Sequence, residues 1–310
     1  MKKILVVGAR EDPHVRFLAD ALRETGEVIH FDYTEFPIIE IRDDDDISIN
    51  SEIIESKNSV ILWRENLTYH KIDNIDFFDR TEKDFFTTQW NDVINFISFR
   101  VPVQNQIKHR GRASAAGSKI LSRRFARSAG IAVPKQIITN NYASIAIFVE
   151  EQESVYKTLG TYLPPKNIPK YTMTITQDFI ENNREHINYT PNLIPEKIVR
   201  RYEKRVLLIG DDVFVSDIDV NAFTDDVDWR RVQENKNMFQ PGSIDNSTKI
   251  KLIEFCKGMN LHTVSFDFIV DKYEEPIFIE CNPFGQFLFV EHFDRSDLIA
   301  SFVKVIQRIP

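Results

Sequence analysis

Short apolar segments alternate with amphipathic ones along the first hundred residues. Apolar runs occupy 3–7, 28–31 and 60–63, and apolar residues recur at helical spacing over 15–22. Short apolar runs on either side of an amphipathic helix are typical of βαβ units, whose strands pair in parallel. We therefore expect a small parallel sheet here. A longer amphipathic helix is expected over about 84–99, where apolar residues follow the helical period.

The helical period is lost over 101–116, a basic stretch of small residues, and we expect a domain boundary there. The next segment resumes helical spacing. Its predicted apolar side consists of Ile120, Leu121, Phe125 and Ala129. Gly130 is expected to end that helix. A strand, a helix and a strand are then expected at 136–139, 143–151 and 154–158. The acidic run 43–46 is expected to be a solvated loop, and the proline-containing stretch 164–169 a mobile one.

Hairpins dominate the last third of the chain. The apolar segments 205–210 and 213–220 flank Asp211 and Asp212, and the segments 262–270 and 276–282 flank a polar turn. Two apolar runs around a tight polar turn are typical of a β-hairpin. Helices are expected beside the second hairpin, at about 247–259 and 296–307. The whole pattern predicts an α/β (α+β) fold.

Composition narrows the class of protein. The chain has 39 Lys and Arg against 47 Asp and Glu, a net charge of −8, which argues against a general affinity for nucleic acids or anionic membranes. Two cysteines are too few for a disulfide framework or a Cys-rich zinc site, and we expect both to be buried. No apolar run is long enough to span a bilayer. We therefore expect a folded cytoplasmic protein.

Familiar catalytic motifs are missing from the sequence. It contains no Gly-x-Ser-x-Gly, His-Glu-x-x-His or Gly-x-Gly-x-x-Gly. The nearest candidate for a phosphate loop is 111–119, but its glycine spacing is one residue too long. Ser118 also precedes Lys119, whereas a phosphate loop has the hydroxyl residue after the lysine. We therefore reject a phosphate-loop interpretation.

Three oxygen-bearing side chains lie on the second predicted hairpin. Side chains alternate along a strand, so Glu280 and Asn282 should project together while Cys281 points away. If Asp267 on the partner strand faces the same way, the three meet. Such hard oxygen ligands suit Mg²⁺, which keeps several waters and is usually completed by substrate phosphates. An ordinary exposed hairpin face explains these three residues alone equally well.

Cationic residues elsewhere in the chain favour the metal site. Lys119 begins a predicted helix, and Lys157 lies in an apolar strand, where burial requires an anionic partner. Arg205 begins another strand, and Arg230 follows Trp229. Two lysines, two arginines and a magnesium site can hold a triphosphate and stabilise phosphoryl transfer. Each cation alone is more often an ordinary surface residue.

The order of these motifs resembles that of the ATP-grasp ligases. Within that superfamily, the chain resembles the microviridin-type peptide maturases, or graspetide cyclases, which make ω-ester and ω-amide macrocycles in ribosomal peptides. The resemblance rests on 118–141, 155–159, 195–214, 228–230 and 266–291, with further matches at 30–37 and 60–65.

The resemblance implies ATP and Mg²⁺ as cofactors, with the nucleotide held between a central and a C-terminal subdomain. The implied limits are 1–115 for the N-terminal, 116–185 for the central and 186–310 for the C-terminal subdomain. Lys119 and Lys157 would contact the phosphates, while Arg205 and Arg230 would stabilise charge during transfer. The adenine hinge would consist of Glu196, Lys197 and Ile198. Glu203 would bind the ribose. Asp267, Glu280 and Asn282 would bind Mg²⁺.

The implied reaction is carboxylate activation in a precursor peptide made of a leader and a core. An Asp or Glu side chain would become an acylphosphate, which a Ser, Thr or Lys side chain would then displace. A homodimer is compatible with this reading. Two alternatives stay open: a RimK-type ligase that adds amino acids to a protein tail or small acid, and a nucleotide-binding regulatory module. The three magnesium ligands argue against the second, because a pure binder has less need of them all.

Overall fold

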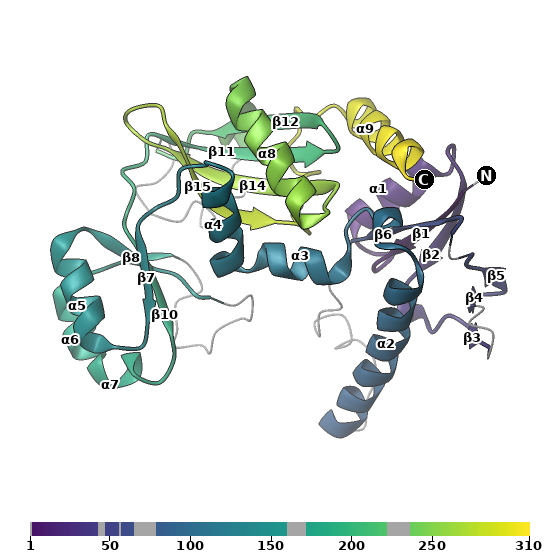
Figure 1. Ribbon diagram of the computed structural model, residues 1–310, viewed down its shortest axis with the longest axis horizontal. Coiled ribbons are helices and arrows are strands. Elements are labelled where there is room, and N and C mark those ends of the chain that lie inside the picture. The colour runs from purple at the N-terminus through teal and green to yellow at the C-terminus, as the bar shows by residue number, and fades with distance from the viewer. Residues whose placement is uncertain (1, 43–46, 56, 65–78, 160–171, 222–235) are drawn as a thin grey trace.

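The computed structural model describes residues 2–42, 47–55, 57–64, 79–159, 172–221 and 236–310 (Figure 1). The predicted loops 43–46 and 164–169 and the predicted phosphate contact Arg230 lie outside the described residues. Helices and strands are mixed throughout the described part, as the sequence predicts. No described helix is both long and apolar enough to cross a membrane.

A parallel sheet with strand order β2-β1-β6 forms near the N-terminus, as expected. Its strands are β1 (Lys3–Val7), β2 (Glu27–Phe31) and β6 (Ser59–Trp63). Helix α1 (Pro13–Leu22) connects β1 to β2, and the Asp12 side chain caps it by accepting a hydrogen bond from the His14 N–H. Proline at the first helical position lacks the N–H that would otherwise be unsatisfied there. The middle strand β1 from Ile4 onward and the strand β6 are buried on both faces and are almost wholly apolar, whereas the edge strand β2 carries Glu27 and His30.

Helix α2 (Arg80–Arg100) covers one face of this sheet, where its Ile94 and Ile97 pack against Leu5 and Trp63. A small antiparallel sheet lies beside it, formed by β3 (Ile39–Ile41), β4 (Ile47–Ile49) and β5 (Glu52–Ile53). Short 3-10 helices occur at η1 (Tyr33–Glu35) and η3 (Val103–Asn105).

Helix α3 (Arg110–Gly117) occupies the stretch where the sequence shows no helical period. Its packing residues are alanines, and Ala113 and Ala116 are fully buried, so close approach replaces the large apolar side chains that make a period visible. Helix α4 (Lys119–Ser128) follows, with Ser118 as its N-cap. The expected helix is therefore present.

The predicted apolar side of α4 is partly wrong. Phe125 and Ala129 pack against the core, but Ile120 is 46% exposed and Leu121 38%. The buried face instead carries Ser122, Arg123 and Ala126. An arginine can occupy that face because a carboxylate and an amide side chain lie next to it, as described below.

The next elements surround a small apolar core of isoleucines. The antiparallel pairs are β7 (Gln136–Thr139) with β10 (Asn192–Pro195), and β8 (Ser154–Tyr156) with β9 (Met173–Ile175). The helices are α5 (Tyr142–Glu151), α6 (Gln177–Asn182) and α7 (Arg184–Ile187). The subdomain limits at 115 and 185 fall within α3 and α7 and stay a prediction.

An antiparallel sheet with order β13-β12-β11-β14-β15 dominates the C-terminal part. Its strands are β11 (Tyr202–Ile209), β12 (Asp212–Ile218), β13 (Phe239–Pro241), β14 (Thr263–Val270) and β15 (Pro276–Asn282). The accompanying helices are α8 (Asn246–Met259), α9 (Arg295–Arg308) and the 3-10 helix η5 (Lys236–Met238). Both expected hairpins, β11–β12 and β14–β15, are confirmed.

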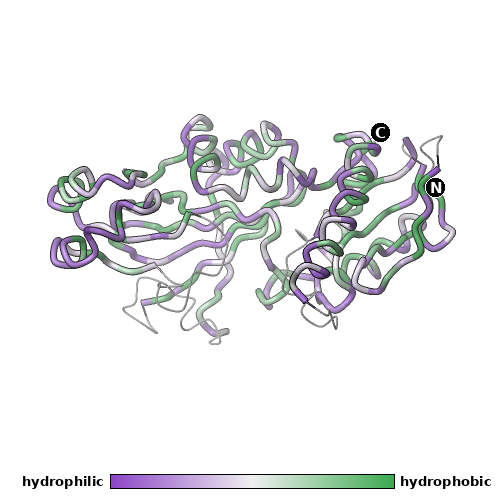
Figure 2. The backbone as a smooth tube through the Cα atoms, turned by 90° about the horizontal axis from the view of Figure 1, so that it is seen from below, coloured by the Kyte–Doolittle hydropathy of each residue, from purple (hydrophilic) through white to green (hydrophobic). Residues whose placement is uncertain are grey.

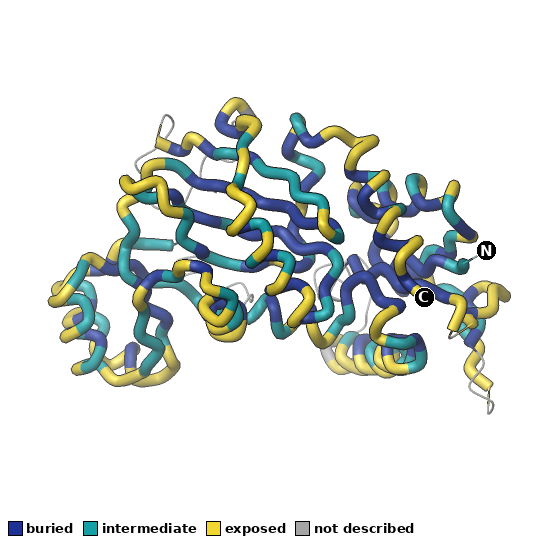
Figure 3. Tube along the Cα trace, turned by 45° about the horizontal axis from the view of Figure 1, so that its top comes forward, coloured by how far each residue is buried: buried dark blue, intermediate teal, exposed yellow. Residues whose placement is uncertain are grey.

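The two faces of this sheet are covered by different helices. Val206 and Phe266 face α8, where they pack with Phe255. Leu207 and Ile209 alternate with them and join the core that contains α9 and α1. Figure 3 shows the middle strands buried and the outer sides of the helices exposed, and Figure 2 shows hydrophobic residues concentrated along those strands.

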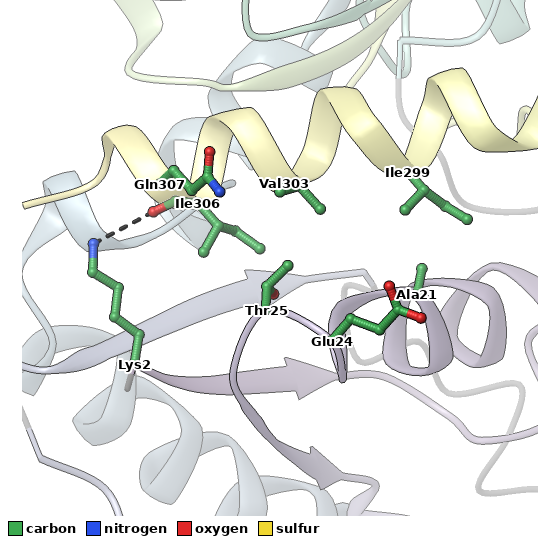
Figure 4. A pocket seen from close by; sticks show the side chains of 8 residues that line it. All are labelled: Lys2, Ala21, Glu24, Thr25, Ile299, Val303, Ile306 and Gln307. Atoms are coloured by element: carbon green, nitrogen blue, oxygen red, sulfur yellow. Dashed lines mark hydrogen bonds between the residues drawn. The ribbon is translucent and has the colours of Figure 1, made fainter.

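Helix α9 lies against α1 and so joins the C-terminal sheet to the N-terminal one (Figures 1 and 4). The Lys2 ammonium donates to the carbonyls of Ile306 and Ile309 at the end of α9, beside a hollow of about 600 Å³. A cation there is favourable, because the last carbonyls of a helix carry partial negative charge. Figure 1 also shows α5–α7 at the opposite end of the molecule from β1 and β2.

Candidate functional site

Three charged side chains form a row across the C-terminal sheet. Arg205 on β11 lies opposite Asp267 on β14, which in turn lies opposite Glu280 on β15. Residues directly opposite each other in antiparallel strands project from the same face, so all three lie on the face away from α8. The Arg205 Nη1 atom donates to the Asp267 carboxylate at 2.7 Å and 3.1 Å. The row therefore places the Arg205–Asp267 ion pair directly beside the Glu280 carboxylate.

The predicted alternation at the end of β15 is present. Cys281 is 5% exposed and packs in the α8-facing core, whereas Asn282 is exposed. The pairing register shifts between Asp267 and Phe268, which leaves Ile279 unpaired on β15. Such a bulge twists the strand locally and is common beside functional sites. Asp267 and Glu280 thus lie directly opposite each other at the edge of the bulge.

Cationic side chains from α4 and from the end of β8 lie around Glu280. Arg123 is 3% exposed, and its Nη1 atom donates to Gln136 Oε1. Burial lowers the pKa of Arg123 to about 10, and the Glu280 carboxylate opposes this change. Burial also lowers the pKa of Lys157; Glu280 opposes the shift, and Arg123 and Lys119 add to it. The Lys119 ammonium donates to the Thr158 carbonyl.

Glu203 lies on the same face as Arg205, because the two are separated by one residue on β11. It is 8% exposed and pairs with Arg200 at 3.0 Å. Burial raises the pKa of Glu203 to about 7 although Arg200 lowers it, and the Asp267 charge raises it further. A buried carboxyl whose charge changes near neutral pH is typical of a ligand site, although ion-pair networks also produce it.

The segment after β10 is held by backbone hydrogen bonds. Glu196 Oε1 accepts from the Lys135 N–H at 2.8 Å, and the Glu196 N–H donates to the Lys135 carbonyl at 3.0 Å. The Lys197 N–H donates to the Glu153 carbonyl at 2.8 Å. In the described part of the chain, the Ile198 N–H has no hydrogen-bond partner. Among the three predicted hinge residues, Ile198 thus has a backbone donor available to a ligand.

The oxygen atoms of Asp267, Glu280 and Asn282 fit Mg²⁺ better than a metal that needs a complete protein cage. Mg²⁺ is usually bound by one or two carboxylates, with waters and substrate phosphates completing the shell. Among the described residues there is no cluster of three or more His, Cys, Asp or Glu. Two carboxylates and an amide on one face agree with such an open site. The Arg205 guanidinium, 2.7 Å from Asp267, balances the charge of that carboxylate.

The segment after Asn282 passes directly over the row. The Gln286 carbonyl accepts from Arg205 Nη2 at 2.9 Å. A Cβ atom on Gly285 would lie 2.8 Å from Arg205 Nη2 and 2.9 Å from Ser265 Cβ. Only glycine therefore fits between the segment and the sheet. The segment thus holds the guanidinium through Nη2, whereas Asp267 binds Nη1.

No family model and no curated protein matches the chain, but solved structures do. A RiPP-associated ATP-grasp ligase of Chryseobacterium gregarium, solved with ADP and a leader and core peptide, superposes with a TM-score of 0.80 at 17% identity, covering 99% of this chain and 97% of that one. The macrocyclase MdnC of Microcystis aeruginosa, bound to its precursor peptide MdnA, gives 0.79 at 19% identity and covers 99% of both chains.

The chain has the ATP-grasp fold. A RimK-domain ATP-grasp protein of Sphaerobacter thermophilus is also similar, with a TM-score of 0.59 at 13% identity over 98% of this chain and 97% of that one. The similarity to the ligases solved with ADP and peptide is therefore the stronger one. It covers the N-terminal sheet as well as the parts that carry the charged row.

Sequence reasoning missed Arg123 in this ATP-grasp chain. It placed the helix but gave Arg123 no role, whereas the residue is buried beside Glu280. A weak signal was available: at helical spacing, Arg123 lies between Ile120 and Ala126, so it shares a helix face with an alanine that proves fully buried.

Proposed function

We propose that this chain is an ATP-dependent peptide macrocyclase of the graspetide type. It would activate Asp or Glu side chains of a ribosomal precursor peptide and join them to Ser or Thr side chains as esters, or to Lys side chains as amides. The observation that carries the proposal is the row Arg205, Asp267 and Glu280, with the buried Arg123 and the half-buried Lys157 beside Glu280. It lies in a fold shared with ligases solved with ADP and precursor peptides.

The nucleotide would lie between the central elements and the C-terminal sheet. Lys157 lies near Glu280, and Lys119 lies near Lys157. Both would bind phosphate oxygens, whose charge would stabilise the two ammonium groups. The Ile198 N–H would donate to the adenine. Glu203 would accept a hydrogen bond from the ribose, although its side chain is paired with Arg200. The Glu196 side chain is already bonded to Lys135, so its contribution would come from its carbonyl.

Asp267, Glu280 and Asn282 would hold Mg²⁺, which neutralises phosphate charge and aligns the transferred group. Arg123, which interacts electrostatically with Glu280, would help to hold that carboxylate in place. Arg205 would stabilise the negative charge that develops on the transferred phosphoryl group. Arg230 is proposed for the same role. Several fixed charges suit this reaction, because negative charge moves in both of its steps.

The two steps balance without a protein nucleophile. In the first, a carboxylate oxygen of the peptide attacks the γ-phosphorus, the bond to ADP breaks, and an acylphosphate forms. In the second, a hydroxyl or amine of the same peptide attacks the acyl carbon, and phosphate leaves with its electron pair. The nucleophile's proton is released to phosphate or solvent. Each ring costs one ATP, and the peptide loses the elements of one water.

Mass spectrometry tests the proposal directly. The purified protein, incubated with Mg·ATP and its precursor peptide, should reduce the mass of the peptide by whole multiples of one water and release ADP in step. Glu280→Gln removes the charge that holds the metal and should slow this turnover by orders of magnitude in a folded protein. Cys281→Ala is the matched control: a small cavity costing on the order of 1 kcal/mol, with near-normal turnover. An active Glu280→Gln variant would contradict the site.

The same assay separates the RimK-type alternative, which the similarity to the Sphaerobacter protein favours. A ligase of that type adds free amino acids, so its product gains the mass of each residue added. Supplying a mixture of amino acids with the peptide distinguishes the two activities in one experiment. Mass gain without any water-loss product would replace the macrocyclase proposal by the RimK-type one. Nucleotide binding without ADP release would instead favour the regulatory module.

A further inference from the structure

His14, in helix α1, holds the segment that follows Asn282. The Nε2 atom of His14 lies 2.9 Å from the backbone N of Phe287 and 3.0 Å from that of Leu288. Both atoms are donors, so Nε2 accepts two hydrogen bonds. The His14 ring also packs edge-on against the Phe287 ring at 4.7 Å. The residue is 4% exposed, and this contact bridges 273 positions of the chain.

The surroundings of His14 keep this acceptor available. Its only ring proton is on Nδ1, which lies 3.1 Å from Asp12 Oδ1, and the same oxygen accepts from the His14 backbone N–H at 2.7 Å. Burial lowers the pKa of His14, the Asp12 carboxylate opposes this shift, and the charges of Arg64 and Lys108 add to it. Protonation of the ring would place a hydrogen on Nε2, which would then point at the N–H groups of Phe287 and Leu288. The neutral form is therefore the one that fits.

The same segment has a second attachment to the N-terminal elements. Arg64, at the end of β6, donates through Nη1 to the Phe284 carbonyl and lies 3.5 Å from Asp12 Oδ2. The Lys108 ammonium is 5.7 Å from the centre of the Phe284 ring. Arg64 and Lys108 are 2% and 3% exposed. Residues 284 to 288 are thus held at both ends by side chains from outside the C-terminal sheet.

Between these two attachments lies the contact with the charged row. The Gln286 carbonyl accepts from Arg205 Nη2, and Gly285 lies against Arg205 and Ser265. Arg205 in turn holds Asp267. A chain of hydrogen bonds therefore runs from Asp12 and His14, through residues 284–288, to Arg205 and its carboxylate partner. We propose that His14 is a positioning residue for Arg205, acting through the two backbone N–H groups that it accepts. This inference rests on the proposed function of the row.

Two substitutions separate positioning from packing. His14→Gln keeps an oxygen acceptor near the position of Nε2, whereas His14→Phe keeps a ring against Phe287 and removes the acceptor. If packing alone mattered, Phe would be the better replacement. We expect the reverse: kcat of peptide cyclisation should fall about tenfold or more in His14→Phe and stay within a few-fold of wild type in His14→Gln. A displacement of about 1 Å at a catalytic group can cost on the order of a hundredfold.

The matched control is Val15→Ala, one residue further along α1. Val15 is fully buried in the same core, and its truncation destabilises the interface without touching an acceptor. Thermal unfolding of all three variants identifies any that fail to fold. Equal loss of kcat in Val15→Ala and His14→Phe at matched stability would overturn the positioning role, and so would wild-type kcat in folded His14→Phe.

A pH profile gives an independent kinetic readout. Protonation of His14 converts its Nε2 acceptor into a donor, so part of the acid limb of kcat in the wild type comes from this residue. His14→Gln cannot be protonated in this range and should keep more of its activity on the acid side of neutrality. An acid limb unchanged in His14→Gln would contradict the inference.

Hydrogen exchange makes the test independent of the peptide reaction. The amides of Phe287 and Leu288 should exchange faster in His14→Phe than in wild type, and those of β12 should not. The change should be much smaller in His14→Gln. If the wild-type protein failed to cyclise any precursor, the proposed function would be wrong. The exchange rates at Phe287 and Leu288 would still test whether His14 holds this segment. Unchanged exchange at 287 and 288 in His14→Phe would overturn the inference whatever the activity.

Discussion

Glu203 shows how a single buried carboxyl can make the stability of the protein depend on pH. Burial raises its pKa from the usual 4.5 to about 7 in the folded state. Between these two values the folded protein holds a proton that the unfolded chain has lost. By linkage, the contribution of Glu203 to the free energy of unfolding is largest below about 4.5 and is lost as pH rises towards 7. Above that range the ionised carboxylate depends on Arg200.

We predict that Glu203→Gln removes this dependence. The variant cannot ionise, so its free energy of unfolding relative to wild type should rise between about pH 5 and pH 8, by an amount on the order of 1 to 3 kcal/mol. Urea unfolding at a series of pH values measures the difference. Because the substitution also removes the Glu203 charge that pairs with Arg200, the change with pH is the decisive quantity. A difference that does not vary with pH would show that Glu203 is ionised throughout.

Strands and helices that bury a simple apolar face could be predicted from the sequence. The βαβ unit and both hairpins follow from apolar spacing and from the polar turns between them. The buried side of α4 could not, because Arg123 is stabilised there by Glu280, which lies 157 positions later. Likewise, α3 packs through alanines that leave no apolar period. The sequence therefore reveals the buried face of a helix or strand when that face packs against an apolar core. It does not reveal the face when burial depends on one charged residue far along the chain.

The segment 284–288 contacts the row of Arg205, Asp267 and Glu280 through Arg205. We predict that Gly285→Ala strongly reduces turnover, because its Cβ would lie 2.8 Å from Arg205 Nη2 and must displace either the guanidinium or the segment. Overpacking of this kind typically costs about 1 to 3 kcal/mol. Kinetics with saturating ATP and peptide should show the loss in kcat.

Gly258 provides the matched control for that substitution. It lies in α8, and a Cβ there has no neighbour within 4 Å. Gly258→Ala should stabilise the protein by about 0.4 to 1 kcal/mol, because alanine lowers the entropy of the unfolded chain, and should leave turnover unchanged. Equal activity in the two alanine variants would show that the close approach at Gly285 is not needed for the reaction.

At the scale of the whole molecule, carboxylates and cations from separate elements face one another where a nucleotide and a metal would lie. The sequence predicted only in part which of these carboxylates and cations lie next to one another. The sequence placed Glu280 and Asn282 on one face because side chains alternate along a strand, but it joined Asp267 to them only on the condition that its strand faced the same way; the pairing of Asp267 with Glu280 meets that condition. The sequence could not show that Arg205 pairs with Asp267, because the order of β11 and β14 in the sheet is a tertiary property.

We predict that Mg·ADP stabilises the protein and that neither component does so as well alone. A ligand that binds only the folded state at a hundred times its Kd adds about 2.7 kcal/mol to the free energy of unfolding. Thermal unfolding with ADP, with Mg²⁺, with both, and with both plus a chelator measures the effect. Glu280→Gln should lose most of the Mg²⁺-dependent part. A shift with ADP that a chelator does not change would argue against a metal held by Glu280 and Asp267.

The packing of α9 on α1 also has a consequence for biosynthesis. One apolar core contains both Ile4 and Ile309, so residues at nearly opposite ends of the chain bury the same surface. While the ribosome is still making the later residues, β1 and α1 can pack on each other, but the side of α1 that α9 covers stays exposed to water. β1 and α1, although made before α9, therefore cannot complete their core until α9 has been made. Such delayed burial makes a nascent chain prone to aggregation and a natural client of chaperones.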